Sequence, residues 1–289
     1  MVVPVVEVKN TLKGKNIMSA GKQVHLLAID CQNDFCDPTG SLFVKGADQD
    51  MIRLSAMIDR LGGKIDEIHV TMDSHQMFHI AHPLFWRDRD GNPPKPLITM
   101  ITHKDVLDGV WQPVNPVLRD WALHYTEMLE KNKRYVLVVW PPHCIIGSKG
   151  HGLVPCFSDA INKWAEEQVA IVSFVTKGSN WKTEHYSAVQ ADVSDPDDPT
   201  TQLNEDVIAA MSVADIILTA GEALDFCFAN TLRDIIEKFG KENAKKFVIL
   251  TDATSCVNAP GLEHLGPDFM KEMLALGVQT STTVDFLAA

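Results

Sequence analysis

The stretch IILTAGEALDFC, residues 216–227, decides the fold that we expect for this chain. Its first residues, 216–219, form an apolar run, and residues 228–239 after it have helical character. Cys227 therefore falls at a turn from a strand into a helix, where unpaired N–H groups and the helix dipole favour a thiolate over a thiol. This position suits a catalytic nucleophile, although a free cysteine can also be a small buried apolar residue. Residues elsewhere in the chain distinguish a catalytic nucleophile from a buried apolar residue.

The same alternation of strand and helix recurs along the chain. Apolar runs predict strands at residues 24–29, 65–71, 169–175, 247–251 and 278–284, and helical character is found at residues 48–61, 158–167 and 266–275. Strands that alternate with helices indicate a parallel sheet with both faces covered. The sequence thus predicts an α/β fold with a doubly wound, mainly parallel sheet between two layers of helices.

Composition excludes several classes of protein. The chain has 289 residues, of which 45% are hydrophobic, so it can bury a sizeable core. A net charge of -12 argues against a nucleic-acid partner, and no apolar run approaches the roughly 18 residues of a membrane span. The six cysteines form no CxxC pair, and no signal peptide is visible at the N-terminus. We expect a cytoplasmic protein with free thiols and no membrane partner, and a homo-oligomer is compatible with the sequence.

We expect a single domain at residues 23–289, preceded by an N-terminal extension at residues 1–22. An insertion with several prolines at about residues 80–134 interrupts it, and one helix is predicted there at residues 117–131. The acidic segment at about residues 191–204 contains two prolines, which favours a solvated loop over a metal site.

Polar residues at the ends of three predicted strands point to chemistry. Asp30 and Lys177 each follow an apolar run, as Cys227 does, and the carboxyl ends of parallel strands can converge on one crevice. A carboxylate can take the thiol proton, and an ammonium group can hold the negative charge, which fits acyl transfer through a thioester. Taken singly, Asp30 could be a turn or helix-capping residue and Lys177 a surface lysine.

A set of metal-ligand residues lies at the same predicted edge. Asp73 and His75 follow the second strand, and His143 follows a later apolar run at residues 135–139. One carboxylate and two imidazoles leave coordination positions open for water or substrate, as catalytic metal sites do.

The chain resembles the nicotinamidases among the isochorismatase-like cysteine hydrolases. Five segments match in the right order: AIDCQNDFC (28–36), MDSHQMFH (72–79), WPPHC (140–144), VTKG (175–178) and EALDFC (222–227). The resemblance implies a catalytic triad of Asp30, Lys177 and Cys227 and a metal bound by Asp73, His75 and His143. The chain departs from the usual pattern of this family at Ser74, where an aromatic residue is common, and in the long stretch from His79 to Trp140.

The resemblance also implies several supporting roles. The backbone N–H groups of Ala223 and Cys227 would form an oxyanion hole, with a cis Glu222–Ala223 peptide bond. His79 would be a further metal ligand or would support one. The residues expected around the substrate are Phe35 and Trp140, on either side of an aromatic ring, and Glu184.

The activity that the resemblance implies is hydrolysis of nicotinamide to nicotinate and ammonia, in NAD salvage. The cofactor would be one divalent transition metal ion, with zinc as the first choice and iron, manganese or nickel as alternatives. Two other interpretations remain at this point. The pocket could take another small amide, such as a ureido or carbamoyl compound, or the fold could serve as a catalytically silent scaffold with the insertion as its partner surface.

Overall fold

The structure is a computed structural model that describes residues 21–132 and 135–287. Its centre is a six-stranded sheet in the order β10-β9-β8-β1-β2-β7, and every pairing in it is parallel. The strands are β1 (Val24–Ile29), β2 (Glu67–Asp73), β7 (Ser173–Lys177), β8 (Ile216–Gly221), β9 (Phe247–Leu250) and β10 (Gln279–Ser281). The predicted α/β class and the doubly wound parallel sheet are confirmed.

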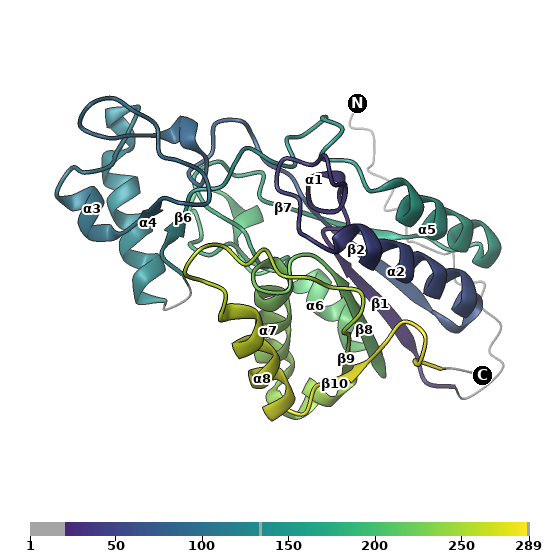
Figure 1. Cartoon of the computed structure of the whole chain (residues 1–289). Coiled ribbons are helices and arrows are strands. Elements are labelled where there is room, and N and C mark those ends of the chain that lie inside the picture. Colours follow the sequence, from purple (N-terminus) through teal and green to yellow (C-terminus); the bar gives the residue numbers. More distant parts are fainter. Residues whose placement is uncertain (1–20, 133–134, 288–289) are drawn as a thin grey trace, which may run out of the picture.

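Helices cover both faces of this sheet (Figure 1). On one face lie α2 (Ala47–Leu61) and α5 (Pro155–Gln168), and on the other lie α6 (Glu205–Ser212), α7 (Cys227–Phe239) and α8 (Leu265–Ala275). Short helical segments connect them: α1 (Asn33–Cys36), η1 (Gly62–Lys64), η4 (Pro199–Thr201) and η5 (Lys241–Lys246). Because helices cover both faces, strand β1 is buried along its whole length and reads as an apolar run.

The segment expected as an insertion packs at one side of the sheet, at the left of Figure 1. It contains α3 (His103–Leu107), α4 (Arg119–Lys131), the short helices η2 (Pro83–Phe85) and η3 (Pro116–Leu118), and two small antiparallel ribbons. These pair β3 (Trp86–Arg87) with β5 (Gln112–Pro113), and β4 (Met100–Ile101) with β6 (Leu137–Val138). The apolar run at 135–139 therefore contributes only a short strand outside the main sheet.

The predicted boundaries of the strand before Lys177 were wrong. Residues 169–175 were expected to be extended, but the strand is Ser173–Lys177. Val169 instead caps α5 in a left-handed conformation with φ 49°, and the Ala170 N–H donates to the Ala165 carbonyl. The end of the helix thus occupies the first residues of the apolar run.

The acidic loop also differs from the expectation of a solvated segment. Asp192 and Asp195 are both buried. Asp195 Oδ2 lies 3.0 Å from Lys182 Nζ and accepts a hydrogen bond from the Asn180 side chain at 3.0 Å. These partners replace the water that the carboxylate gives up on burial.

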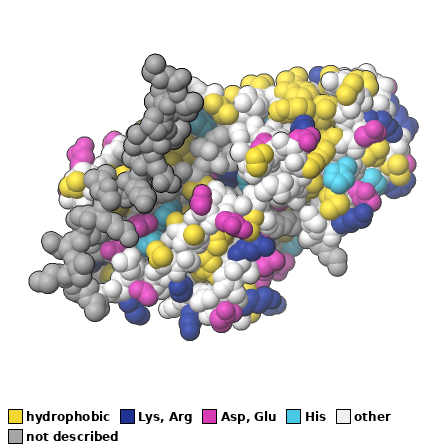
Figure 2. All heavy atoms as spheres, turned by 180° about the vertical axis from the view of Figure 1, so that it is seen from behind, with side chains coloured by type: hydrophobic (Ala, Val, Ile, Leu, Met, Phe, Trp, Pro, Cys, Tyr) yellow, Lys and Arg dark blue, Asp and Glu magenta, His cyan; other side chains and the backbone are white. Residues whose placement is uncertain are grey.

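The division into an extension and one domain stays a prediction, because residues 1–20 lie outside the described residues. No helix in the described ranges is long and apolar enough to cross a membrane. Figure 2 shows hydrophobic side chains gathered at the surface on the side of the insertion, whose exposed apolar residues include Ile98, Leu107, Val114 and Val117.

Candidate active site

The side chains of Asp30, Lys177 and Cys227 meet at the carboxyl edge of the sheet. Asp30 directly follows β1, Lys177 is the last residue of β7, and Cys227 is the first residue of α7. Lys177 Nζ lies 2.9 Å from Asp30 Oδ2 and 3.4 Å from Cys227 Sγ. Thr71 Oγ1 donates to Asp30 Oδ1 at 2.5 Å, which leaves the other carboxylate oxygen for the lysine. The structure thus brings the three predicted residues into direct contact.

Burial controls the protonation of this group. The sequence predicted that the helix N-terminus would favour a thiolate, but burial raises the pKa of Cys227 well above its usual value, although Lys177 opposes this. Burial also raises the pKa of Asp30, and the nearby Lys177 again acts in the opposite direction. Burial would lower the pKa of Lys177, but Asp30 and Asp73 raise it well above its usual value. The resting site therefore holds a thiol beside an ion pair, and a carboxylate with a raised pKa is suited to accept the thiol proton.

The backbone N–H groups of Ala223 and Cys227 are the donors expected to form an oxyanion hole. The Glu222–Ala223 peptide bond is cis, as the resemblance implied. Among the described residues, neither the Ala223 N–H nor the Cys227 N–H donates a backbone hydrogen bond, whereas the neighbouring Leu224 and Phe226 N–H groups do. Both donors are thus available to a developing negative charge.

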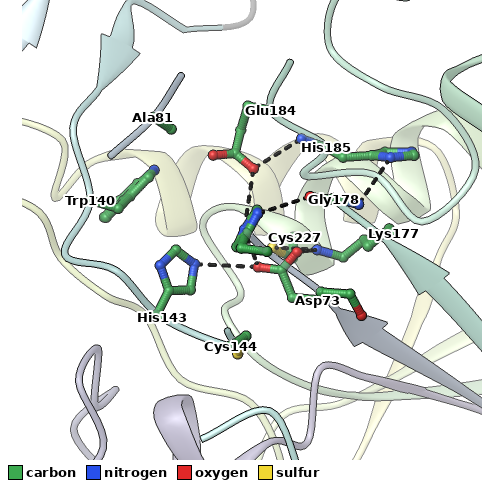
Figure 3. A network of polar contacts seen from close by, with 12 residues as sticks. Asp73, Ala81, Trp140, His143, Cys144, Lys177, Gly178, Glu184, His185 and Cys227 are labelled. Atoms are coloured by element: carbon green, nitrogen blue, oxygen red, sulfur yellow. Dashed lines mark hydrogen bonds and ion pairs between the residues drawn. The ribbon is translucent and has the colours of Figure 1, made fainter. Parts of the chain in front are cut away.

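The Asp73 carboxylate joins this group to a set of metal-ligand side chains (Figure 3). Its Oδ1 lies 3.0 Å from Lys177 Nζ, while its Oδ2 lies 2.9 Å from His75 Nε2 and 3.3 Å from His143 Nε2. The His75 Nδ1–H donates to the Gly178 carbonyl, and the His143 Nδ1–H donates to the Pro141 carbonyl. Because carbonyl groups only accept, Nδ1 carries the proton in each ring, and the neutral ring then has its lone pair on Nε2, as metal ligation requires.

His82 is a further candidate ligand that the sequence reasoning missed. Its Nδ1–H donates to the Met77 carbonyl, and its buried Nε2 has no hydrogen-bond partner among the described residues. The ligand atoms of His75, His82 and His143 all lie within 4.8 Å of one another. Burial lowers the pKa of His82 to about 2, so the ring is neutral and can coordinate a metal. Its only sequence signal was its position three residues after His79.

His79 is less well placed as a ligand, although its ring lies 4.4 Å from that of His75. Its Nε2–H donates to the Thr183 carbonyl, and its Nδ1 accepts the Ala81 N–H. Both ring nitrogens are therefore engaged. The groups that could hold a metal ion here are His75, His82 and His143, with the Asp73 carboxylate in contact with two of them, and also His75, His79 and Glu184.

The residues expected around the substrate lie beside these groups. The Phe35 ring is 5.3 Å from that of His143, and Trp140 packs against Phe226 while its Nε1–H donates to the Tyr186 hydroxyl at 2.8 Å. Glu184 is buried with Oε1 3.8 Å from His75 Nε2, and its Oε2 has no hydrogen-bond partner among the described residues. Glu184, Trp140 and His143 are drawn on one side of the group that contains Asp73 and Cys227 (Figure 3).

A cavity of about 520 Å³ reaches Lys177, and its other lining residues include Gly178, His185 and residues 199–206. Neither Cys227 nor the metal-ligand residues line it.

Comparison with solved structures identifies the fold as that of nicotinamidases and pyrazinamidases. The nicotinamidase/pyrazinamidase of Acinetobacter baumanii is 21% identical, with a TM-score of 0.61, over 93% of this chain and 100% of that one. The yeast nicotinamidase bound to nicotinaldehyde is 18% identical, with a TM-score of 0.58, over 90% and 100%. The Pyrococcus horikoshii pyrazinamidase in complex with zinc is 18% identical, with a TM-score of 0.52, over 90% and 99%. No protein-family model and no curated protein sequence matches the chain.

Proposed function

We propose that this chain is a metal-containing cysteine amidohydrolase that converts nicotinamide to nicotinate and ammonia. The observation that carries the proposal is the contact of Lys177 with Asp30, Cys227 and Asp73, which joins a thiol nucleophile, its base and a metal-ligand set in one buried cluster. The names of the structural neighbours, including one bound to nicotinaldehyde, support the same substrate.

In the first half of the reaction, the Asp30 carboxylate takes the Cys227 thiol proton as the sulfur attacks the carboxamide carbon. The carbonyl oxygen becomes negative in the tetrahedral intermediate, and the Ala223 and Cys227 N–H groups hold it. The C–N bond then breaks, and Asp30 passes its proton to the leaving nitrogen. The products of this half are ammonia and a thioester on the cysteine.

In the second half, Asp30 removes a proton from a water molecule that attacks the thioester carbon. The C–S bond breaks, the sulfur recovers a proton, and nicotinate is released. Lys177 stays protonated throughout, because two carboxylates surround it, and its charge offsets the negative charge shared by Asp30 and the sulfur.

A divalent ion held by Asp73, His75 and His143, with His82 in reach, would supply a Lewis-acidic position for a ring nitrogen. The Nε2 atom of His82, which has no hydrogen-bond partner among the described residues, fits such an ion, since a buried nitrogen lone pair without a donor is otherwise costly. Trp140 would offer an aromatic face for the substrate ring.

Ammonia release measured across a panel of small amides tests the proposal. We expect the highest kcat/KM for nicotinamide, with small ureido and carbamoyl compounds far behind. Preference for a ureido compound would replace the substrate and keep the thioester chemistry. Absence of ammonia release from every amide would overturn the proposed activity and favour a scaffold.

A further inference from the structure

A second cluster of metal-ligand side chains lies at the opposite, amino end of the sheet. His25 is near the start of β1, and Glu67 and His69 are near the start of β2. In the parallel register His25 is opposite Glu67, and Leu27 is opposite His69. Because side chains alternate along a strand, all three project from the same face of the sheet. This cluster lies about 16 Å from Asp30, at the rise of about 3.3 Å per residue along β1.

The distances within the cluster fit a cation. His69 Nε2 lies 3.3 Å from His25 Nδ1 and 3.4 Å from Glu67 Oε2, and His25 Nδ1 lies 4.0 Å from the same oxygen. Ligands at about 2.0–2.1 Å from a tetrahedral zinc ion lie roughly 3.3–3.4 Å apart. Two of the three separations have this value, and the third needs only a small movement of the Glu67 side chain, which is 51% exposed.

The three candidate ligand atoms can face one ion together. Each imidazole nitrogen and the carboxylate oxygen can bind a cation through a lone pair, and these atoms all lie within 4.8 Å of one another.

We propose that His25, Glu67 and His69 form a second divalent-metal site, separate from the catalytic centre and best suited to zinc. Two imidazole nitrogens and one carboxylate oxygen supply three ligands, and water completes the tetrahedron. The exposed Glu67 carboxylate gives the ion a path from solvent. The site ties together β1 and β2, the strands that carry Asp30 and Asp73 at their other ends.

The test measures zinc bound per chain in the full-length protein after dialysis against buffered free Zn²⁺. We expect Glu67→Gln and His69→Ala each to lose one zinc relative to wild type, while His124→Ala, at an exposed histidine of α4, loses none. Glu67→Gln changes a surface side chain, so its folding is not at risk if His69→Ala fails to fold. Loss of a ligand should weaken binding by at least about 100-fold, since residues that only support ligands cost 10–100-fold.

The same measurements in a His143→Ala background separate this site from the catalytic one. We expect this variant, loaded with Co²⁺, to show the visible absorption of tetrahedral cobalt, and Glu67→Gln added to it to remove the band. Equal zinc content and affinity in wild type and Glu67→Gln would overturn the proposal and leave the two histidines as a hydrogen-bonded pair. The result does not depend on the amidase activity.

Discussion

At the carboxyl ends of β1 and β2, Asp30 and Asp73 are both buried and share the ammonium group of Lys177. At the amino ends of the same strands, His25 and His69 are buried beside the half-exposed Glu67 carboxylate, and the Asp66 carboxylate accepts a hydrogen bond from the Val24 N–H. Two buried carboxylates require a fixed counter-charge, which Lys177 supplies. The carboxyl end thus holds two buried carboxylates that share one cation, whereas the amino end holds the two histidines of the proposed second metal site.

The largest effect should come from Cys227→Ala, because the sulfur is the only nucleophile at the carboxyl end in the proposed scheme. We expect kcat to fall by about 10⁴-fold or more. A continuous ammonia assay measures the loss, and Cys256→Ala is the control. If Cys227→Ala kept more than a few per cent of the wild-type kcat, Cys227 would not be the nucleophile. Zinc bound at the amino end should not change in Cys227→Ala.

Replacing Lys177 tests whether the two buried carboxylates at the carboxyl end need the cation that they share. Lys177→Met keeps much of the side-chain volume but leaves Asp30 and Asp73 buried without their cation. We expect the free energy of unfolding to fall by about 3–5 kcal/mol, as for other broken buried pairs. Urea unfolding measures this, and Lys163→Met is the control, since Lys163 forms an exposed ion pair with Asp59. Equal losses for the two variants would contradict the role given to Lys177.

Substrate analogues test whether a metal at the carboxyl end receives the ring nitrogen. Benzamide has the carboxamide and ring of nicotinamide but lacks that nitrogen, so we expect its kcat/KM to be lower by about 100-fold or more. Comparable values for the two amides would contradict metal coordination of the substrate.

Loss of the Trp140 ring should lower kcat/KM less than loss of the ring nitrogen from the substrate. Trp140→Ala should raise KM for nicotinamide about tenfold with little change in kcat, because stacking acts in the ground and transition states alike. Initial-rate kinetics measure this split. A fall in kcat with unchanged KM would instead indicate that Trp140 orients the reacting groups.

The last effect, which depends on pH, concerns Glu222, beside the proposed oxyanion hole. Burial, followed by the nearby Asp50, raises the pKa of Glu222 well above its usual value. The folded chain therefore keeps a proton that the unfolded chain releases above about pH 4.3, so this group lowers stability as pH rises. Glu222→Gln, which mimics the neutral acid, should gain stability over wild type from pH 5 to pH 8, by about 1.4 kcal/mol per pH unit at most. A pH-independent difference in urea unfolding would contradict this.

The sequence predicted best the residues that directly follow or end regular strands. The bounds of β1 were predicted correctly, and Cys227 begins a helix as expected. The apolar runs of buried parallel strands make their ends visible in the sequence. The structure also places Asp30, Lys177 and Cys227 together, while their catalytic roles stay predictions.

Features that depend on pairing between distant segments could not be predicted. His82 lies in a segment without clear periodicity, where nothing shows which ring nitrogens are already engaged. His25 and His69 are 44 residues apart, and only the register between β1 and β2 makes them neighbours. The burial of Asp195 likewise depends on Lys182 and Asn180, which approach it only in the folded chain.

Strand β7, which carries Lys177, is at the edge of the sheet and pairs only with β2. Amide groups on its outer side therefore lack a neighbouring strand in the described part of the chain, and local opening needs only one ladder to break. Such an opening would withdraw Lys177 from Asp30 and Asp73 at once. Hydrogen exchange at residues 173–177 would then report how often a folded molecule is transiently inactive.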